Sequence, residues 1–286
     1  NFPECNGVLQ RAIQEADEDI FYPNFNEVGV IMPTSACGYH GLSYLGSLPL
    51  NTTDGDQVMT TLHLINGDPN LHIVAHEIIH NYWLLHANRR ECPTIPGQDF
   101  ECLIDARYPY DVMGYRYTFN NIPYRGPGHP NTILKTELGW MSSANTQIVS
   151  KSGTYTIAPL EKTAGSRVQA LQLQHAFGPR AKYIIEYRQP IGADARFGSM
   201  DGVLVELKRN ISDRESFLIR TGTQIGEFLL PVGQTFSDLV SGVSITPLGK
   251  LPNGEMQVSV QVDPLLGSYP DLVVPELITP SSVTVG

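Results

Sequence analysis

The pattern of apolar and polar residues differs between two parts of this chain, and the change falls near residue 147. In the first part, Leu9, Ile13 and Ile20 recur near the spacing of an α-helix, so residues 8–20 are predicted to form an amphipathic helix. Short apolar runs that end in turn residues predict strands at 26–33, 39–50 and 58–65. Glycines interrupt the second of these runs, which favours a strand at the edge of a sheet.

A second helix is predicted to begin at Pro69, because proline is favoured in the first turn of a helix and Asp68 can act as its N-cap. This helix should run at least to His80. Residues 88–130 are rich in Pro, Gly, Asn and Asp and predict a long irregular stretch, which is usually functional or tied by disulfides. A short helix is expected over residues 132–140, where a glycine ends it.

The second part of the chain consists of short alternating or β-branched runs separated by turn residues, a pattern typical of an antiparallel β-sandwich. The predicted strands lie at residues 154–159, 168–174, 183–187, 202–207, 227–230, 243–247 and 256–262. The expected fold class is therefore α+β. We expect a first domain at residues 1–146, the β-sandwich at 147–264, and a linker or the start of a further β-repeat at 265–286.

Composition narrows the classes of function. The chain has 286 residues, 41% hydrophobic and 17% charged, enough for two cores of ordinary size. Its 29 acidic residues outnumber 19 Lys and Arg, and the formal charge of −10 without a basic run argues against nucleic-acid binding. No apolar stretch approaches the roughly 18 residues that span a bilayer. No basic-then-apolar leader begins the sequence, so we expect that any signal peptide or pro-segment has already been removed. The remaining chain is expected to be soluble, globular and monomeric.

The four cysteines, Cys5, Cys37, Cys92 and Cys102, contain no C-x-x-C pair of the kind found in zinc ribbons or redox motifs. An even number suits two disulfides in an exported protein, for which three pairings are possible. Cys92 and Cys102 flank a loop with proline and glycine, so the expected pairs are Cys92–Cys102 and Cys5–Cys37. Four buried free thiols in a cytosolic protein remain the alternative.

The most informative motif is His76-Glu77-Ile78-Ile79-His80, on the second predicted helix. Residues four apart share one helical face, so His76 and His80 can direct imidazole nitrogens at one tetrahedral zinc ion. Glu77 lies about 100° around the helix, where it can accept a proton from water at the metal. The pattern predicts a zinc site with Glu77 as general base.

His86 is the candidate third ligand. In a continuous helix it would lie off the face shared by the first two histidines, so the chain must turn sharply between His80 and His86. The rival is Glu101, which is followed by Asp105 in a pattern that resembles the second metal helix of thermolysin-like enzymes, whose ligands are two His and one Glu. We expect His86, with Glu101 left open as the alternative.

Residues 76–86, HEIIHNYWLLH, resemble the long zinc motif of the metzincins, H-E-x-x-H-x-x-G-x-x-H. Residues 111–115, DVMGY, resemble the Met-turn that follows this motif. Within that clan the chain is similar to the secreted gametolysin-like and immune-inhibitor-A-like endopeptidases, and the similarity includes residues 37–42, 138–140 and 183–188. The resemblance implies a catalytic domain with a twisted sheet, an active-site helix and a C-terminal helix.

The resemblance also assigns roles to single residues. It implies zinc ligands at His76, His80 and His86, with Glu77 as the general base and Met113 as a hydrophobic floor. Tyr115 matches the tyrosine that swings toward the metal in some metzincins, and an ordinary place in the wall of the site is the alternative. Trp83 stands where the family has glycine. Because a bulky residue with positive φ costs about 1–2 kcal/mol, the turn must be strained or made differently.

The function that the resemblance implies is a secreted bacterial zinc endopeptidase acting on protein or peptide substrates. A pseudo-protease that serves as a binding or adhesion module is the alternative from another class, because Trp83 could distort the site. Calcium is a further cofactor that these enzymes often bind. Asp194, Asp201 and Asp238 could hold it, although solvated surface is the preferred interpretation for all three. Residues 269–286 resemble the first strand of a bacterial adhesion-type β-repeat.

Overall fold

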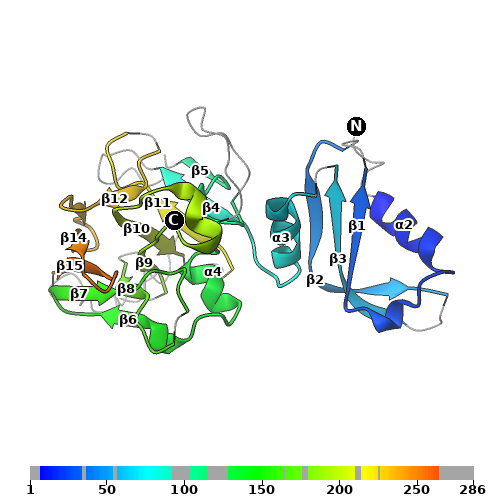
Figure 1. Ribbon diagram of the computed structural model, residues 1–286, viewed down its shortest axis with the longest axis horizontal. Coiled ribbons are helices and arrows are strands. Elements are labelled where there is room, and N and C mark those ends of the chain that lie inside the picture. The colour runs from blue at the N-terminus through cyan, green and yellow to red at the C-terminus, as the bar shows by residue number, and fades with distance from the viewer. Residues whose placement is uncertain are drawn as a thin grey trace, which may run out of the picture.

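The chain folds into two bodies that lie side by side, one mostly N-terminal and one mostly C-terminal (Figure 1). The computed structural model describes residues 7–33, 37–53, 57–67, 69–91, 103–114, 128–163, 165–175, 180–209, 214–224 and 226–263. Helices and strands are both present and strands predominate, so the expected α+β class is confirmed. Within the described part of the chain, no helix is long and apolar enough to cross a membrane.

The N-terminal body is a three-stranded sheet with two helices packed on it. Its strands are β1 (Glu27–Met32), β2 (Gly41–Asn51) and β3 (Gln57–Asn66), in the order β1-β3-β2, with β1 parallel and β2 antiparallel to β3. The expected edge position of β2 is confirmed. Helix α2 (Val8–Ala16) is shorter than predicted and buries Leu9 and Ile13 against the sheet, and a 3-10 turn, η1 (Tyr22–Asn24), precedes β1.

Helix α3 (Leu71–His80) packs against β2 and β3 and lies between this sheet and the C-terminal body (Figure 1). It begins two residues later than predicted. Its N-cap is Asn70, whose side-chain oxygen accepts a hydrogen bond from the N–H of Ile73 at 3.1 Å. Asp68, the predicted N-cap, lies outside the described residues, and the cap at Asn70 shows that the prediction was wrong.

The C-terminal body contains an eight-stranded sheet, in which seven strands follow the order β5-β4-β11-β10-β9-β8-β6 and β12 pairs with β10. These strands are β4 (Ala87–Glu91), β5 (Leu103–Asp105), β6 (Thr146–Val149), β8 (Ala170–Gln174), β9 (Lys182–Glu186), β10 (Gly202–Lys208), β11 (Ser216–Ile219) and β12 (Leu229–Pro231). The prediction of a purely antiparallel sandwich is wrong, because β6 runs parallel to β8 and β4 runs parallel to β11. Strands β4 and β5 also lie within residues 88–130, where only irregular structure was predicted.

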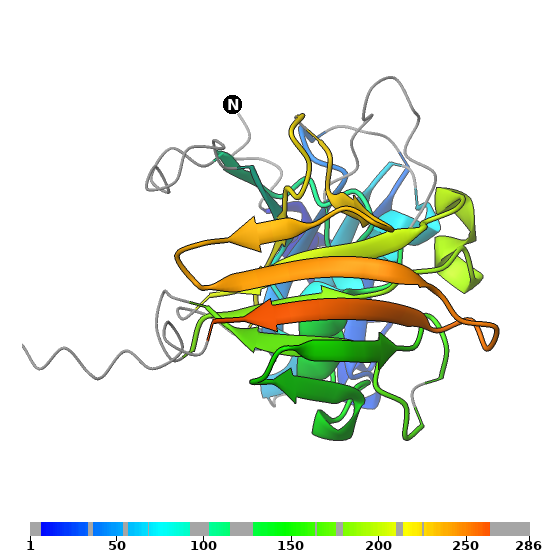
Figure 2. The same ribbon diagram turned by 90° about the vertical axis from the view of Figure 1, so that its left-hand side faces the viewer.

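A second, fully antiparallel sheet packs on the first. It has the order β13-β14-β15-β7, and Figure 2 shows β14, β15 and β7 side by side across one face. Its strands are β7 (Gly153–Ile157), β13 (Phe236–Asp238), β14 (Val243–Lys250) and β15 (Met256–Val262). Ile185 and Val205 of the larger sheet and Ile245 and Val258 of the smaller one are fully buried in the shared core.

The larger sheet joins segments from both sides of residue 147. Strand β4 pairs with β11 from Ala87 opposite Ser216 to Arg90 opposite Ile219, so its hydrogen bonds cross the predicted domain boundary. Helix α4 (Thr132–Glu137) contacts β9, and Gly139 after it has a φ of 72°, which agrees with the predicted stop at a glycine. Short 3-10 turns, η3 (Ser143–Asn145) and η4 (Gly192–Phe197), complete this body. Residues 265–286 lie outside the described part.

Candidate metal centre

The first two candidate ligands, His76 and His80, lie on the face of α3 that is turned away from solvent, with 4% and 9% of their surfaces exposed. Their Nε2 atoms are 3.1 Å apart, and their rings meet edge to face with centroids 4.7 Å apart. The spacing of four residues therefore places both imidazoles on one helical face, as predicted.

The helix ends at His80, and the next residues form the sharp turn that the third histidine requires. Trp83 donates its backbone N–H to the carbonyl of His80 at 2.9 Å and has a φ of 68°. Among the described residues, it is the single non-glycine residue with positive φ. The chain thus makes the turn with a strained tryptophan where the metzincin motif has glycine. Leu85 then donates its N–H to the carbonyl of Arg214 at 2.9 Å, which attaches the segment to the C-terminal body.

This turn brings His86 to the other two histidines. Its ring centroid lies 5.2 Å from that of His76 and 4.8 Å from that of His80. One ring nitrogen from each of the three histidines lies within 4.8 Å of the others. Three convergent imidazoles are a donor set that zinc prefers in sites that keep one position open. Glu101, the rival ligand, lies outside the described residues.

Backbone carbonyls fix the orientation of two of these rings. Nδ1 of His76 donates to the carbonyl of Val112 at 2.8 Å, and Nδ1 of His80 donates to the carbonyl of Leu84 at 2.7 Å. A carbonyl can only accept, so Nδ1 carries the proton in each ring and Nε2 is the nitrogen that can offer a lone pair. Ligating histidines commonly make such contacts.

Burial keeps the three imidazoles neutral. The pKa of His76 lies well below its usual value, mainly because the ring is buried and secondly because His80 is close to it. Burial likewise lowers the pKa of His80, and burial with the nearby His80 lowers the pKa of His86 to about 4. Neutral imidazole is the form that binds a metal ion, so the site is in the right protonation state at neutral pH.

Glu77 lies beside the histidines with 6% of its surface exposed. Burial raises the pKa of its carboxyl to about 7, and the side chain of Ser43 nearby partly offsets this effect. The hydroxyl of Ser43, on β2, donates its hydrogen bond to the backbone carbonyl of Glu77 at 2.6 Å. Gly41 faces the carboxylate so closely that any side chain at position 41 would overlap it. Strand β2 is therefore fitted to the position of Glu77.

A cleft of about 650 Å³ contains these groups. It runs between α3 and the edge strand β2. Apart from the candidate ligands and Glu77, its lining includes the apolar side chains of Leu42, Leu45, Ile73 and Leu85 and two further histidines, His40 and His72. Of these further histidines, His72 lies against His76, with the ring centroids 5.7 Å apart and the ring planes tilted by 45°.

The predicted Met-turn forms a tight turn next to the site. Met113 is fully buried and packs in the same apolar cluster as Ile79 and Leu84. Its carbonyl accepts a hydrogen bond from Ala87, the residue after His86, at 2.9 Å. Tyr115, the candidate swinging tyrosine, lies outside the described residues.

The three candidate calcium ligands have different surroundings, and among the described residues they form no common group of potential metal ligands. Asp194 is fully buried and pairs with Arg188 at 2.9 Å, so the interpretation of solvated surface was wrong for this residue. Asp238 accepts a hydrogen bond from the Tyr183 hydroxyl at 3.0 Å, and Asp201 accepts one from Ser199 at 2.9 Å. Calcium binding by these residues stays a prediction.

Cys37 is the one cysteine among the described residues. It is 7% exposed and disulfide-bonded, with a partner outside the described residues. The pairings Cys5–Cys37 and Cys92–Cys102 therefore stay predictions.

Several groups that shape the site were not predicted. The carbonyls of Leu84 and Val112 carry no sequence signal, because every residue has a backbone carbonyl. Gly41 could have been suspected, since a glycine inside a predicted strand often marks the close approach of another group, whereas Ser43 has no comparable signal. Comparison with family models, curated proteins and solved structures finds no match to this chain.

Proposed function

We propose that this protein is a zinc-dependent endopeptidase with His76, His80 and His86 as metal ligands and Glu77 as general base. The proposal rests mainly on one observation: three neutral imidazoles, one from beyond the end of the helix, converge beside a buried carboxylate in a single cleft. That donor set fits zinc, because zinc is commonly bound by three protein ligands and keeps a fourth position for a reactant.

When bound, zinc supplies a Lewis acid that polarises a carbonyl group and acidifies water. The protein's own groups prepare the site for that chemistry. The carbonyls of Val112 and Leu84 hold His76 and His80 in one tautomer and one orientation. The positive φ of Trp83 ends the helical path and returns His86 to the other ligands.

Glu77 is suited to move protons. A carboxyl group with a pKa of about 7 can accept a proton from water and later donate it to a departing amine near neutral pH. Gly41 leaves the space that the carboxylate occupies, and Ser43 ties its backbone to β2. Glu77 is therefore positioned by the strand on the opposite wall of the cleft.

The cleft also supports a peptide as the substrate. Strand β2 is an edge strand of its sheet and supplies Leu42, Ser43 and Leu45 to the lining. An extended peptide can add to such an edge through backbone hydrogen bonds, while apolar lining residues receive its side chains. We propose on these grounds, and on the resemblance to gametolysin-like and immune-inhibitor-A-like enzymes, that the substrate is an unfolded or extended protein segment outside a bacterial cell.

Two alternatives differ from this proposal in specific ways. In a pseudo-protease acting as a binding module, the metal could be kept while turnover is lost. The presence of Glu77 in the cleft weighs against that, because the proton acceptor is in place. In a two-His, one-Glu site, Glu101 would replace His86, and the proximity of His86 to both helical histidines weighs against that.

The experiment that tests the proposal combines metal analysis with hydrolysis of an unfolded protein substrate. The expected result is one zinc per chain and hydrolysis that a chelator abolishes and added zinc restores. Glu77→Gln should keep the zinc and lose hydrolysis, while Glu15→Gln, on the exposed face of α2, should keep both. Zinc without any hydrolysis in the unsubstituted protein would favour the binding module.

A further inference from the structure

The carbonyl that orients His76 belongs to the tight turn at residues 111–114. Val112 in this turn accepts the hydrogen bond from His76 at 2.8 Å. Met113, the next residue, accepts one from Ala87 at 2.9 Å, directly after His86 in the chain. The turn therefore contacts two of the three candidate ligand segments, and its position affects the geometry of both.

A single carboxylate organises this turn. Asp111 is fully buried, and its Oδ1 accepts the N–H of Met113 at 2.7 Å while its backbone carbonyl accepts the N–H of Gly114 at 3.1 Å. Its other carboxylate oxygen, Oδ2, accepts the N–H of Asn131 at 2.6 Å. One side chain thus closes the turn and ties it to the start of α4.

Asn131 is itself held from two sides. Its side-chain oxygen caps α4 by accepting the N–H of Leu134 at 3.0 Å, and its Nδ2 donates to the hydroxyl of Ser216 on β11 at 2.5 Å. Asn131 has no exposed surface, so it offers Asp111 a fixed partner rather than a mobile one.

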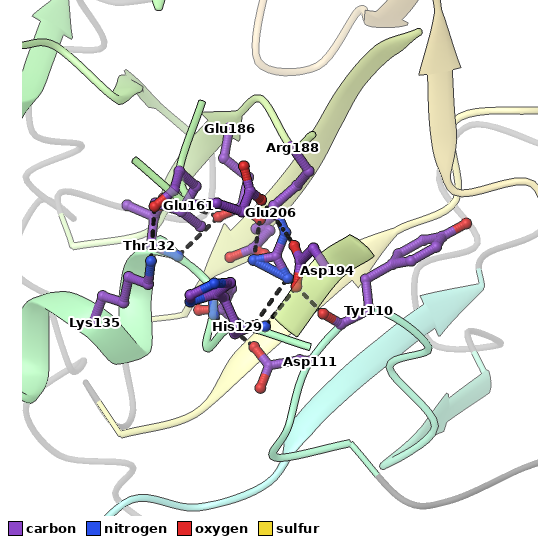
Figure 3. A network of polar contacts seen from close by, with 12 residues as sticks. Tyr110, Asp111, His129, Thr132, Lys135, Glu161, Glu186, Arg188, Asp194 and Glu206 are labelled. Atoms are coloured by element: carbon purple, nitrogen blue, oxygen red, sulfur yellow. Dashed lines mark hydrogen bonds and ion pairs between the residues drawn. The ribbon is translucent and has the colours of Figure 1, made fainter. Parts of the chain in front are cut away.

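Arg188, two residues after the end of β9, holds the two segments that meet at Asp111 (Figure 3). Its Nη2 donates to the carbonyl of Tyr110 at 2.5 Å and to the carbonyl of His129 at 2.9 Å. Its Nε pairs with Asp194 at 2.9 Å, and all of these charged groups are buried. The C-terminal body therefore fixes the residue before Asp111 and the residue two before Asn131.

We infer that Asp111 is a positioning residue for the three-histidine site. It acts through the turn at 111–114 on His76 and on the segment of His86, and Arg188 anchors it to the C-terminal body. This inference rests on the proposed zinc site. It adds a residue that touches none of the ligands, lies outside the zinc motif, and links the ligand geometry to a distant part of the chain.

The test is Asp111→Asn, which keeps the shape of the side chain. The amide nitrogen of asparagine cannot accept a hydrogen bond, so either Met113 or Asn131 loses its partner. Changes to groups that orient metal ligands typically weaken metal binding 10–100-fold, so we expect zinc affinity to fall about tenfold or more in competition with a chelating dye. The visible spectrum of the cobalt-substituted variant should also change, because the ligand geometry changes.

Glu206→Gln is the matched control. Glu206 is fully buried in the same region, and its hydrogen bond from the Tyr108 hydroxyl can be kept by the amide oxygen of glutamine. This variant also removes one buried carboxylate, but none of the hydrogen bonds that hold the turn at residues 111–114 involves Glu206. We expect its zinc affinity and cobalt spectrum to match those of the unsubstituted protein, whatever its stability.

The outcomes separate this inference from the proposed function. Unchanged zinc affinity in Asp111→Asn, or an equal loss in Glu206→Gln, would overturn the positioning role and leave the zinc site intact. Absence of stoichiometric zinc in the unsubstituted protein would overturn both. If Asp111→Asn does not fold, hydrogen exchange of the unsubstituted protein decides. Coupling requires that zinc slow exchange of the Met113 and Asn131 amides more than that of Val258 in the sandwich core, and equal slowing would overturn the inference.

Discussion

The indole of Trp83 lies directly over Gly46 of β2, in the space that any side chain at position 46 would need. The guanidinium of Arg214 lies over the same ring, 5.1 Å from its centroid. Trp83 therefore contacts a strand of the N-terminal body and a residue just before β11 in the C-terminal body. Trp83 is nevertheless 49% exposed, so these two contacts, rather than deep burial, accompany the positive φ of its backbone.

Replacing Trp83 by Gly and by Ala separates the backbone strain from the loss of packing, because both variants lose the indole. The positive φ destabilises the folded state by about 1–2 kcal/mol when the residue is not glycine. Glycine removes this strain, but it also gives the unfolded chain more conformational entropy, which offsets part of the gain. We expect Trp83→Gly to exceed Trp83→Ala by about 0.5–1 kcal/mol in the free energy of unfolding by urea. Tyr82 is the control position, because it is an exposed neighbour in the same turn and lacks a positive φ. There, the Tyr82→Ala variant should be at least as stable as the Tyr82→Gly variant.

The third ligand can be identified by comparing His86→Ala with Glu101→Ala. If His86 completes the site, its removal leaves two ligands, so zinc content and hydrolysis should both be lost. Glu101→Ala should retain both. Metal analysis after dialysis against a weak chelator makes this comparison. The opposite pattern would assign the protein to the class with two histidines and one glutamate.

Asp238 should make the free energy of unfolding depend on pH in the acid range. Burial alone would raise the pKa of this carboxyl, but hydrogen bonds from Ser241 and Tyr183 outweigh it and leave the pKa below its ordinary value. A lowered pKa in the folded state stabilises the protein above the ordinary aspartate pKa of about 3.9, and this contribution is lost as the pH falls through the lowered value. The difference in free energy of unfolding between the unsubstituted protein and Asp238→Asn should shrink as the pH falls below about 4. A difference that stays constant from pH 6 to pH 3 would contradict this assignment.

The expected disulfides can be mapped by mass spectrometry of unreduced peptides. We expect the pairs Cys5–Cys37 and Cys92–Cys102, and the second closes a short loop between β4 and β5. In the chain-entropy model a crosslink of this size contributes about 2–3 kcal/mol, so mild reduction should lower the urea midpoint. Four alkylatable thiols in the unreduced protein would contradict both the pairing and the expected export.

Much of the local structure could be predicted from the sequence, because the spacing of apolar residues along a helix or strand shows which of its faces is buried. Strand β15 has the predicted bounds, 256–262, where apolar and polar residues alternate without a break. Strand β4 was missed because its sequence, ANRRE, has no apolar alternation, yet all five residues are buried. Its charged side chains pair instead: Arg89 contacts Glu91 and Asp105, both at 2.8 Å. Glu91 belongs to β4 itself, but Asp105 comes from β5, and a pairing between two strands has no local pattern.

The site was predictable where its residues share one helix and less so elsewhere. His76, Glu77 and His80 follow from helical geometry alone. His86 required a turn that the sequence disfavours, because tryptophan seldom adopts positive φ, and the contacts with Gly46 and Arg214 come from distant segments. Asp111 was noted only as the first residue of a resembling turn, since its partner Asn131 lies 20 residues further along the chain.

The parallel pairing of β4 with β11 also determines when the histidine site can form during synthesis of the chain. During synthesis, residues 76–86 leave the ribosome early, whereas Ser216, which lies opposite Ala87, follows about 130 residues later. Until then β4 lacks its neighbour, and His86, one residue before it, lacks the strand pairing that holds its segment in place. A nascent chain therefore possesses the whole histidine motif long before it can assemble the histidine site.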